Sequence, residues 1–268
     1  MKQYRLGLLR LPGRFVALLA VALLPVAQRG WAQTADSTKQ HLYFKGAVSV
    51  TNNGFSFIPS FSLGKPAAIV NLNLSGGKRF SFEPEFRYGL SGKPWSFIFI
   101  WRYKLVHTRR FQLTLGTHLP ALNFRTVPVV KNGVQQDVIQ STRFFPVMEL
   151  GPNLALAKDI NVGLFYLYGQ GVKEDQTPNT HFLSLRANFS NIRLSPKWYL
   201  RAQPQVFYLR SDTKDGFYAA SSLSLGRRGF PLSVSTLVNK RIRTDIAGKD
   251  LDWNISLVYA FGKEYVRL

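Results

Sequence analysis

The stretch that most constrains the fold lies near the C-terminus, where residues 251–261 read L-D-W-N-I-S-L-V-Y-A-F. Side chains of an extended strand alternate between two faces, so one face of this stretch is apolar and the other is small or polar. The apolar face consists of Trp253, Ile255, Leu257, Tyr259 and Phe261. Aromatic side chains stand at both ends of that face, which is typical of strands that meet two membrane–water interfaces. The stretch therefore predicts a strand in a barrel wall.

The same residues resemble the C-terminal assembly strand of bacterial outer-membrane β-barrels. In that family the strand ends on its aromatic residue, whereas this chain continues through residues 262–268. The resemblance implies that residues 253–261 are recognised by barrel-assembly machinery. It also implies that the folded protein contacts outer-membrane lipids, including lipopolysaccharide.

The N-terminal residues have the features of a secretory signal peptide. Basic residues come first, an apolar segment follows at 15–26, and the small residues Gly30 and Ala32 flank Trp31 just before the expected cleavage after Ala32. A transmembrane helix would need about 20 apolar residues, and Pro25 interrupts this segment. We predict a signal peptide at residues 1–32, a short polar lead at 33–40 and one barrel domain at 41–268.

The chain is strongly basic, with 35 Lys and Arg residues against 14 Asp and Glu and a formal net charge of +21. Removal of residues 1–32 takes away basic residues only and leaves a net charge of +16. A nucleic-acid partner is not expected, because the basic residues are spread along an exported chain rather than clustered. A phosphate-rich membrane surface or a small anionic solute in the lumen fits better. There is no cysteine, so disulfide and thiolate chemistry are excluded.

Aromatic and β-branched segments of strand length recur between turn signals along the mature chain, as in an up-and-down barrel. Uninterrupted apolar runs outside the signal, such as residues 97–101, are too short for a membrane-spanning helix. We predict an all-β, transmembrane antiparallel barrel of about 12 strands, within a range of 10–14. The predicted strands are 55–63, 67–75, 80–90, 95–106, 111–122, 143–155, 160–170, 180–192, 198–210, 217–225, 230–240 and 251–261. Residues 41–50 also have strand character, either as a further strand or as part of a long first strand.

Connection lengths support the same architecture. Longer connections, predicted at 123–142, 171–179, 211–216 and 241–250, alternate with shorter ones at 107–110, 156–159, 193–197 and 226–229. Outer-membrane barrels have long external loops and short periplasmic turns. We therefore expect residues 123–142, with Lys131 to Gly133 near the tip, to be the longest external loop. The connections at 64–66 and 91–94 would be external but short, which predicts a low wall on that side.

A second resemblance lies in residues 79–105, R-F-S-F-E-P-E-F-R-Y-G-L-S-G-K-P-W-S-F-I-F-I-W-R-Y-K-L, together with F-S-L-G-K-P at 61–66. These residues resemble uncharacterised outer-membrane barrel proteins of Bacteroidota-type Gram-negative bacteria. The resemblance implies the fold and an outer-membrane location, reached through the cleaved signal peptide. It implies no catalytic residue.

The hairpin at 79–105 separates into two faces by the same alternation. One face is aromatic and is expected to contact lipid: Phe80, Phe82, Phe86, Tyr88, Trp95, Phe97, Phe99, Trp101 and Tyr103. The other face brings a charge cluster into the lumen, formed by Glu83, Glu85, Arg87, Arg102 and Lys104. A structural ion-pair network is preferred over a substrate site. Arg186 and Arg201 add inward positive charge and are the candidates for lumen selectivity.

No convincing catalytic or metal site is found. His181 and Ser184 lie three residues apart, hence on opposite faces of a strand, and cannot form the His–Ser pair of an outer-membrane phospholipase without a bulge. His118 points inward with no carboxylate two residues away, and no spacing suits a metal. The Gly-rich residues 75–79 lack the P-loop spacing and fit a hairpin turn. We predict no enzyme activity, no cofactor and no metal.

Function is therefore predicted at the level of class. A small passive pore with a weak anion preference is the first expectation, since unbalanced basic residues in a narrow lumen favour anions. A closed structural or surface-recognition barrel that acts through its external loops is the alternative. A lipid-modifying enzyme of the outer membrane is the less favoured third class.

Overall fold

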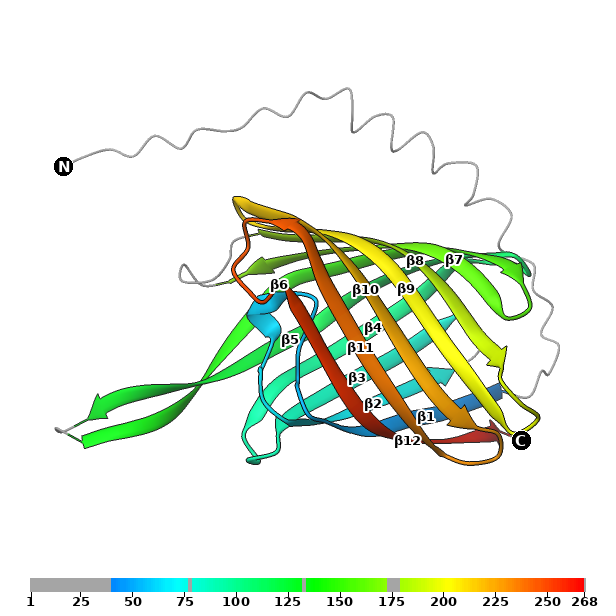
Figure 1. Cartoon of the computed structure of the whole chain (residues 1–268), viewed down its shortest axis with the longest axis horizontal. Helices are drawn as coiled ribbons and strands as arrows, with labels where there is room; N and C mark the ends of the chain where they lie inside the picture. The colour runs from blue at the N-terminus through cyan, green and yellow to red at the C-terminus, as the bar shows by residue number, and fades with distance from the viewer. Residues whose placement is uncertain (1–39, 77–78, 132–133, 173–178, 268) are drawn as a thin grey trace, which may run out of the picture. The chain divides into compact units, whose positions relative to one another are not determined.

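The computed structural model describes residues 40–76, 79–131, 134–172 and 179–267. Within these ranges twelve antiparallel strands form one closed barrel, as Figure 1 shows. The predicted all-β barrel with about twelve strands is confirmed. The predicted signal peptide and all of the polar lead except Gln40, where the first strand begins, lie outside the described residues. No helix in the described ranges has the length and apolar content needed to cross a membrane.

Each strand pairs with its neighbours in sequence, and the last strand closes the ring against the first. The strands are β1 (Gln40–Thr51), β2 (Ala67–Gly76), β3 (Phe80–Gly89), β4 (Pro94–His107), β5 (Phe111–Lys131), β6 (Val134–Ala157), β7 (Ile160–Gly171), β8 (Asn179–Arg193), β9 (Trp198–Ser211), β10 (Lys214–Arg227), β11 (Leu232–Thr244) and β12 (Leu251–Arg267). The closing β1–β12 register runs from Gln40 opposite Arg267 to Thr51 opposite Ser256. Residues 262–267 therefore continue the terminal strand.

The prediction of a first strand at 55–63 is wrong, and residues 41–50 supply the first strand instead. The aromatic alternation of F-S-F-I-P-S-F-S-L suggested a strand, but Pro59 begins a 3-10 turn, η1 (Pro59–Phe61), and Gly64 has φ 70°. Proline removes a ladder donor, and a positive φ breaks an extended run. The β1–β2 connection is thus residues 52–66, so the predicted short connection at 64–66, and the low wall inferred from it, are corrected.

The long external loop predicted at 123–142 is also corrected, because most of it is paired strand. Strand β5 continues to Lys131, strand β6 begins at Val134, and the ladder runs from Asn123 opposite Thr142 to Lys131 opposite Val134. Residues rich in Val and Ile with few turn signals favour this extension. Figure 1 shows the hairpin projecting well beyond the other strands. Pairing also reduces the predicted connection 211–216 to residues 212–213.

The connections define two ends of the barrel. The loop end carries connections 52–66, 90–93, 132–133, 172–178, 212–213 and 245–250. The turn end carries connections 77–79, 108–110, 158–159, 194–197 and 228–231, together with the start of β1 and the finish of β12. An even strand number places both strand termini at one end, as in bacterial single-chain barrels.

The outer surface is apolar along most strands, while inward positions carry most of the buried residues. On β12, Trp253, Ile255, Leu257 and Tyr259 are about half exposed, and the alternate Asn254 is buried. The same alternation exposes Leu183, Leu185 and Val206 and buries Phe182, Ser184 and Phe207. Period-two patterning therefore identified the outward face of these strands.

Trp95 departs from the predicted lipid-facing aromatic set, because its side chain is buried with an exposed fraction of 2%. The register of β3 and β4 shifts here: Arg87 lies opposite Ser96, and Tyr88 lies opposite Pro94. This bulge adds one residue to β4, so Trp95 turns inward beside Ser96, which is also buried. Other members of the set remain on the outer face, where Phe82 stacks on Trp101 with ring centroids 4.1 Å apart.

Candidate functional site

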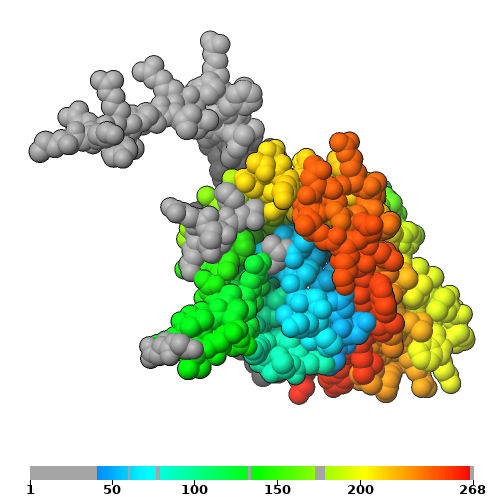
Figure 2. Space-filling model, turned by 60° about the vertical axis from the view of Figure 1, so that its left-hand side comes forward, coloured from blue at the N-terminus to red at the C-terminus, as the bar shows by residue number. Residues whose placement is uncertain are grey.

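The lumen is the candidate functional site, and its loop-end half is crossed by residues 52–66. Phe57 packs against the inward wall of β8 and β9, with its ring centroid 6.1 Å from that of Phe182 and 5.3 Å from that of Phe207. On the opposite side, the ring of Phe61 lies 4.7 Å from that of Phe144 on β6. The segment therefore contacts two separate parts of the wall. Figure 2 shows its blue-to-cyan atoms in the mouth of the barrel, between the green and orange strands.

Backbone and tryptophan contacts hold this segment in place. The amide of Gly54 donates to the carbonyl of Lys65 at 2.8 Å, and the amide of Leu63 donates to that of Gly54 at 2.8 Å. Trp95 Nε1 donates to the carbonyl of Phe61 at 2.7 Å. A Cβ on Gly54 would lie 2.9 Å from the Trp95 ring, so close approach requires glycine there. The bulge that turns Trp95 inward thus places its side chain in contact with residues 52–66, which cross the lumen.

The wall under Phe57 forms an apolar, largely aromatic cluster. Its buried members are Phe182, Phe207, Leu209, Tyr218 and Ala220. The rings of Phe207 and Tyr218 stack with centroids 4.7 Å apart and an interplanar angle of 7°. A smaller cluster of Ala121, Phe144 and Val147 packs against Phe61. Side chains consequently occupy most of the loop-end half of the lumen and leave a cavity of about 160 Å³ beside Phe61 and Phe144.

The turn-end half is polar and contains a buried ion-pair network. Arg102 pairs with Glu83 and with Glu149, whose Oε2 also accepts from Arg102 Nη2 at 3.1 Å. His118 Nε2 lies 3.0 Å from the same Glu149 oxygen. Glu149 is 3% exposed, and a Cβ on Gly116 of the adjacent strand would lie 2.6 Å from its carboxylate. Gly116 therefore leaves the space that the Glu149 side chain occupies.

The charge cluster predicted from residues 79–105 is divided in space. Glu83 and Arg102 belong to the Glu149 network, whereas Glu85 pairs with Arg87, whose guanidinium lies 4.9 Å from the Trp95 ring. Lys104 lines the polar cavity beside the network. Sequence reasoning missed Glu149, although its position two residues from inward Val147 could have indicated an inward carboxylate. It also placed no acid near His118, because Glu149 comes from a different strand.

A polar cavity of about 420 Å³ lies in this half of the lumen. Amide side chains make up much of its wall: Gln112, Asn153, Asn161, Asn188 and Gln203. The cations Arg102 and Lys104 reach it from β4 and Arg186 reaches it from β8, together with the acids Glu83 and Glu149. The guanidinium of Arg186 lies 5.0 Å from the ring of Phe165, another lining residue. Such a wall can bind a hydrated or anionic solute through amides and guanidinium groups.

Arg201 lines a different cavity, at the mouth of the turn end. This cavity measures about 840 Å³ and includes Tyr199, Arg201 and Arg228. The Tyr199 ring lies 5.0 Å from the Arg201 guanidinium and 5.7 Å from that of Arg228. Asp159 also lines the cavity, so an acid is present near Arg201. The two arginines proposed for selectivity therefore line two different cavities: Arg186 lines the polar cavity inside the lumen, and Arg201 lines the cavity at its turn-end mouth.

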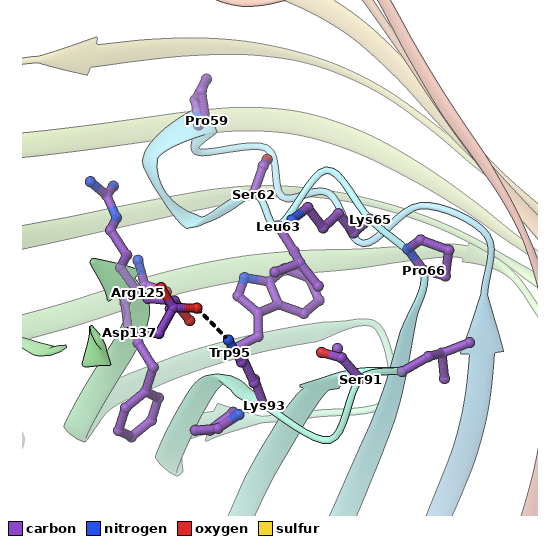
Figure 3. A pocket seen from close by; sticks show the side chains of 16 residues that line it. Pro59, Ser62, Leu63, Lys65, Pro66, Ser91, Lys93, Trp95, Arg125 and Asp137 are labelled. Carbon is purple, nitrogen blue, oxygen red and sulfur yellow. Dashed lines mark hydrogen bonds and ion pairs between the residues drawn. The ribbon is translucent and has the colours of Figure 1, made fainter. Parts of the chain in front are cut away.

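The loop end has an outer cleft of about 910 Å³, drawn in Figure 3. It lies between residues 59–66, the β3–β4 connection and the base of the long hairpin. Lys65, Lys93 and Arg125 contribute positive charge, and Lys93 Nζ pairs with Asp137 at 3.1 Å. Trp95 forms part of the floor, which connects this cleft with the segment that crosses the lumen.

The His–Ser pair considered for catalysis is separated by the barrel wall. His181 is on the outer face, where its Nδ1 lies 2.8 Å from the hydroxyl of Tyr166. Ser184 faces inward and donates to Gln205 at 3.0 Å. Across the described residues, no group of three or more His, Cys, Asp or Glu side chains is arranged to hold a metal ion.

Neither a known protein family nor a curated protein matches the sequence. Among solved structures, the chain is similar to the KdgM porin in complex with disordered oligogalacturonate, with a TM-score of 0.51, 9% identity, and 82% of this chain and 99% of that chain covered. An outer-membrane channel from Pseudomonas putida F1 has a TM-score of 0.45 at 10% identity, covering 87% and 98% of the two chains. The NanC porin has a TM-score of 0.43 at 13% identity, covering 85% and 100%. The likeness to the KdgM porin establishes that the two proteins share a fold.

Proposed function

We propose that this protein is an outer-membrane barrel that acts as a small passive channel with a preference for anionic solutes. The observation that carries the proposal is the polar cavity in the turn-end half, lined by amides and by Arg102, Lys104 and Arg186. A narrow, low-dielectric wall strengthens the field of such cations. The KdgM structure was solved with oligogalacturonate, and a similar acidic solute would suit this wall.

The membrane location is supported by the apolar outer face, which would be unfavourable in water over an area of this size. Exposed Leu and Val occupy the middle of several strands, with Trp253 and Phe217 near the loop end and Phe80 and Trp198 near the turn end. This distribution suits a hydrocarbon band between two aromatic belts. We place the loop end outside the cell and the turn end in the periplasm. The resemblance to Bacteroidota barrels, the assembly role of residues 253–261 and contact with lipopolysaccharide belong to the same proposal.

The balance of charge in the cavity favours an anion. Glu83 and Glu149 both pair with Arg102, so their charge is largely compensated there. Arg186 and Lys104 form no ion pair among the described residues. At physiological ionic strength the Debye length is about 8 Å, so these two cations act over distances comparable with a small lumen. Arg201 extends the positive potential to the mouth.

Passage through the loop end depends on residues 52–66. Because Phe57 and Phe61 contact opposite parts of the wall in this half of the lumen, conduction requires either a narrow path beside the segment or its displacement. The same contacts favour a second function, a closed barrel that presents its outer cleft and long hairpin for recognition. These functions differ in whether the purified protein conducts ions.

Planar-bilayer conductance distinguishes the two functions. The parent protein is compared with a Phe57→Ser, Phe61→Ser double variant, which should conduct several-fold more because both wall contacts of the segment are removed. Leu90→Ser, an exposed apolar residue in the neighbouring connection, is the matched control and should leave conductance unchanged. Absence of conductance in both the parent and the double variant would overturn the channel and favour the closed barrel.

Reversal potential under a salt gradient tests the anion preference. The parent should prefer anions, and Arg186→Glu and Arg201→Glu should each shift selectivity toward cations. Arg210→Glu makes the same charge change on the outward face of β9 and serves as the control. Selectivity that responds equally to all three substitutions would show that the lumen arginines have no special role.

A further inference from the structure

The exposed charge of the turn end is almost entirely basic. Eight of its exposed basic residues are here called the basic rim: Arg79, Arg109, Arg110, Lys158, Lys197, Arg227, Arg228 and Lys263. Arg193 and Arg201 are also exposed at this end. The acids described at this end are Asp159 and Glu264, and both have local partners. Asp159 accepts from Ser190 and Asn191 at 3.3 and 3.4 Å, and Glu264 lies 2.6 Å from His41. The rim therefore has an uncompensated positive charge.

The loop end is different, because acidic and basic residues are mixed there. Its described acids are Asp137, Asp212, Asp215, Asp245, Asp250 and Asp252. Several of them contact neighbouring basic or hydroxyl groups, as Asp137 does with Lys93 and Asp215 does with Tyr208. The basic rim is therefore specific to one end of the barrel and does not simply follow from the high net charge.

The basic residues are distributed around the whole circumference. Each turn-end connection contains at least one described basic residue: Arg79, Arg109, Lys158, Lys197 or Arg228. Exposed aromatic side chains accompany them at the same level: Phe80, Tyr103, Phe111, Trp198 and Tyr265. A protein partner or a polymer would require charge on one face, whereas a lipid leaflet surrounds a barrel on all sides. Aromatic and basic residues together are typical of a membrane–water interface.

We propose that the basic rim binds the anionic headgroups of the phospholipid leaflet at the turn end. The inference rests on the membrane location proposed above and goes beyond the channel function. Arg227 shows the geometry, since it follows the exposed Leu223 and Leu225 on the outward side of β10. Its partner across the β9–β10 ladder is Trp198, and Lys197 comes just before that tryptophan. The guanidinium thus lies where the strand leaves the apolar band, at the depth of lipid phosphates.

Trp198 is a built-in reporter for this surface, because its side chain is 44% exposed and paired with Arg227. In a Trp31→Phe, Trp101→Phe, Trp253→Phe background, Trp198 is the lipid-accessible tryptophan of the full chain, since Trp95 is buried in the lumen. The protein is reconstituted in vesicles that contain phosphatidylcholine and acyl-brominated lipid. Quenching by brominated phosphatidylglycerol is compared with quenching by brominated phosphatidylcholine. We expect brominated phosphatidylglycerol to be enriched around Trp198 over brominated phosphatidylcholine on the order of fivefold. This is the enrichment that about one basic residue near an anionic lipid surface would produce.

Two variants and a second reporter make the test specific. The Lys197→Gln, Arg227→Gln double variant should abolish the preference of Trp198 for phosphatidylglycerol, and 1 M salt should do the same. Lys240→Gln, at the loop end, should leave this preference unchanged. A background that retains Trp253 in place of Trp198 should show no preference for phosphatidylglycerol. Equal quenching of Trp198 by the two lipids would overturn the basic rim as a lipid site while leaving the channel intact. Absence of quenching by both lipids would instead overturn the membrane location itself.

Discussion

The two halves of the lumen differ in what fills them, although the same strands line both. Strand β8 presents Phe182 toward the loop end and Arg186 toward the turn end, and β9 likewise presents Phe207 and then Gln203. The loop-end half is packed around residues 52–66 and keeps a cavity of about 160 Å³, while the turn-end half keeps a larger, polar cavity of about 420 Å³. Alternation along a strand decides only which face a side chain occupies. The chemistry of the lumen depends on where along the strand the inward residues change from aromatic to polar.

The largest loss of stability is expected from Phe207→Ala, in the packed loop-end half. Phe207 is 2% exposed, and its ring contacts those of Phe57, Phe182 and Tyr218. Its truncation should lower the free energy of unfolding by about 4 kcal/mol, since it leaves a cavity in the packed half. Denaturant titration of the vesicle-reconstituted protein measures this. Val206→Ala, on the outward face at 51% exposure, is the control and should cost much less. Equal losses would mean that the loop-end half is not tightly packed.

A somewhat smaller loss is expected from Glu149→Gln in the polar half. The substitution removes the charge that Arg102 and His118 share at a carboxylate with 3% exposure. The free energy of unfolding should fall by about 3 kcal/mol, because the partly buried Arg102 loses its charged partner at a buried position. Asp137→Asn breaks an exposed pair with Lys93 and should cost less than about 1 kcal/mol in the same titration. If the two substitutions lower the free energy of unfolding equally, the Glu149 network would stabilise the protein no more than an exposed ion pair does.

The smallest effect is expected from Trp95→Phe, which tests the contact between the bulge and the crossing segment. The substitution removes the Nε1 donor to the Phe61 carbonyl and should cost about 1 kcal/mol. Amide hydrogen exchange should accelerate within residues 55–63 and stay unchanged in the strands. Trp101→Phe removes a similar bond to Leu119 on the outer face and should leave the segment unaffected. Unchanged exchange in both variants would show that other contacts alone hold the segment.

The strand pattern was predictable because a barrel wall requires alternation, and alternation can be recognised in residues such as 251–261 without knowledge of their partners. The inward direction of Glu83, Arg102 and Arg186 follows from the same period. Residues 55–63 could not be assigned correctly, because their phenylalanines alternate as in a strand while packing against a wall far away in sequence. Trp95 was misplaced for a related reason: its bulge depends on the register of β3 and β4, which one strand alone does not reveal.

Partnerships between distant strands were equally inaccessible to sequence reasoning. Glu149 pairs with Arg102 across 47 residues, and no local spacing marks the two as neighbours. The long hairpin was missed because polar residues such as Gln135 and Gln136 resemble a loop, although cross-strand pairing extends through them. Local composition predicted the fold class well, while the shape of the lumen depended on contacts between segments far apart in the chain.

The long β5–β6 hairpin affects how the protein tolerates proteolytic cleavage. Beyond Asn123 and Phe144 its two strands pair only with each other among the described strands. Residues 124–131 rise at about 3.4 Å each, a reach of about 27 Å beyond the barrel. A two-stranded ribbon has little stability of its own and is a preferred place for proteolytic cleavage. A cut there would leave the pairing below Asn123 in place, so a nicked chain would still form a closed ring of twelve strands.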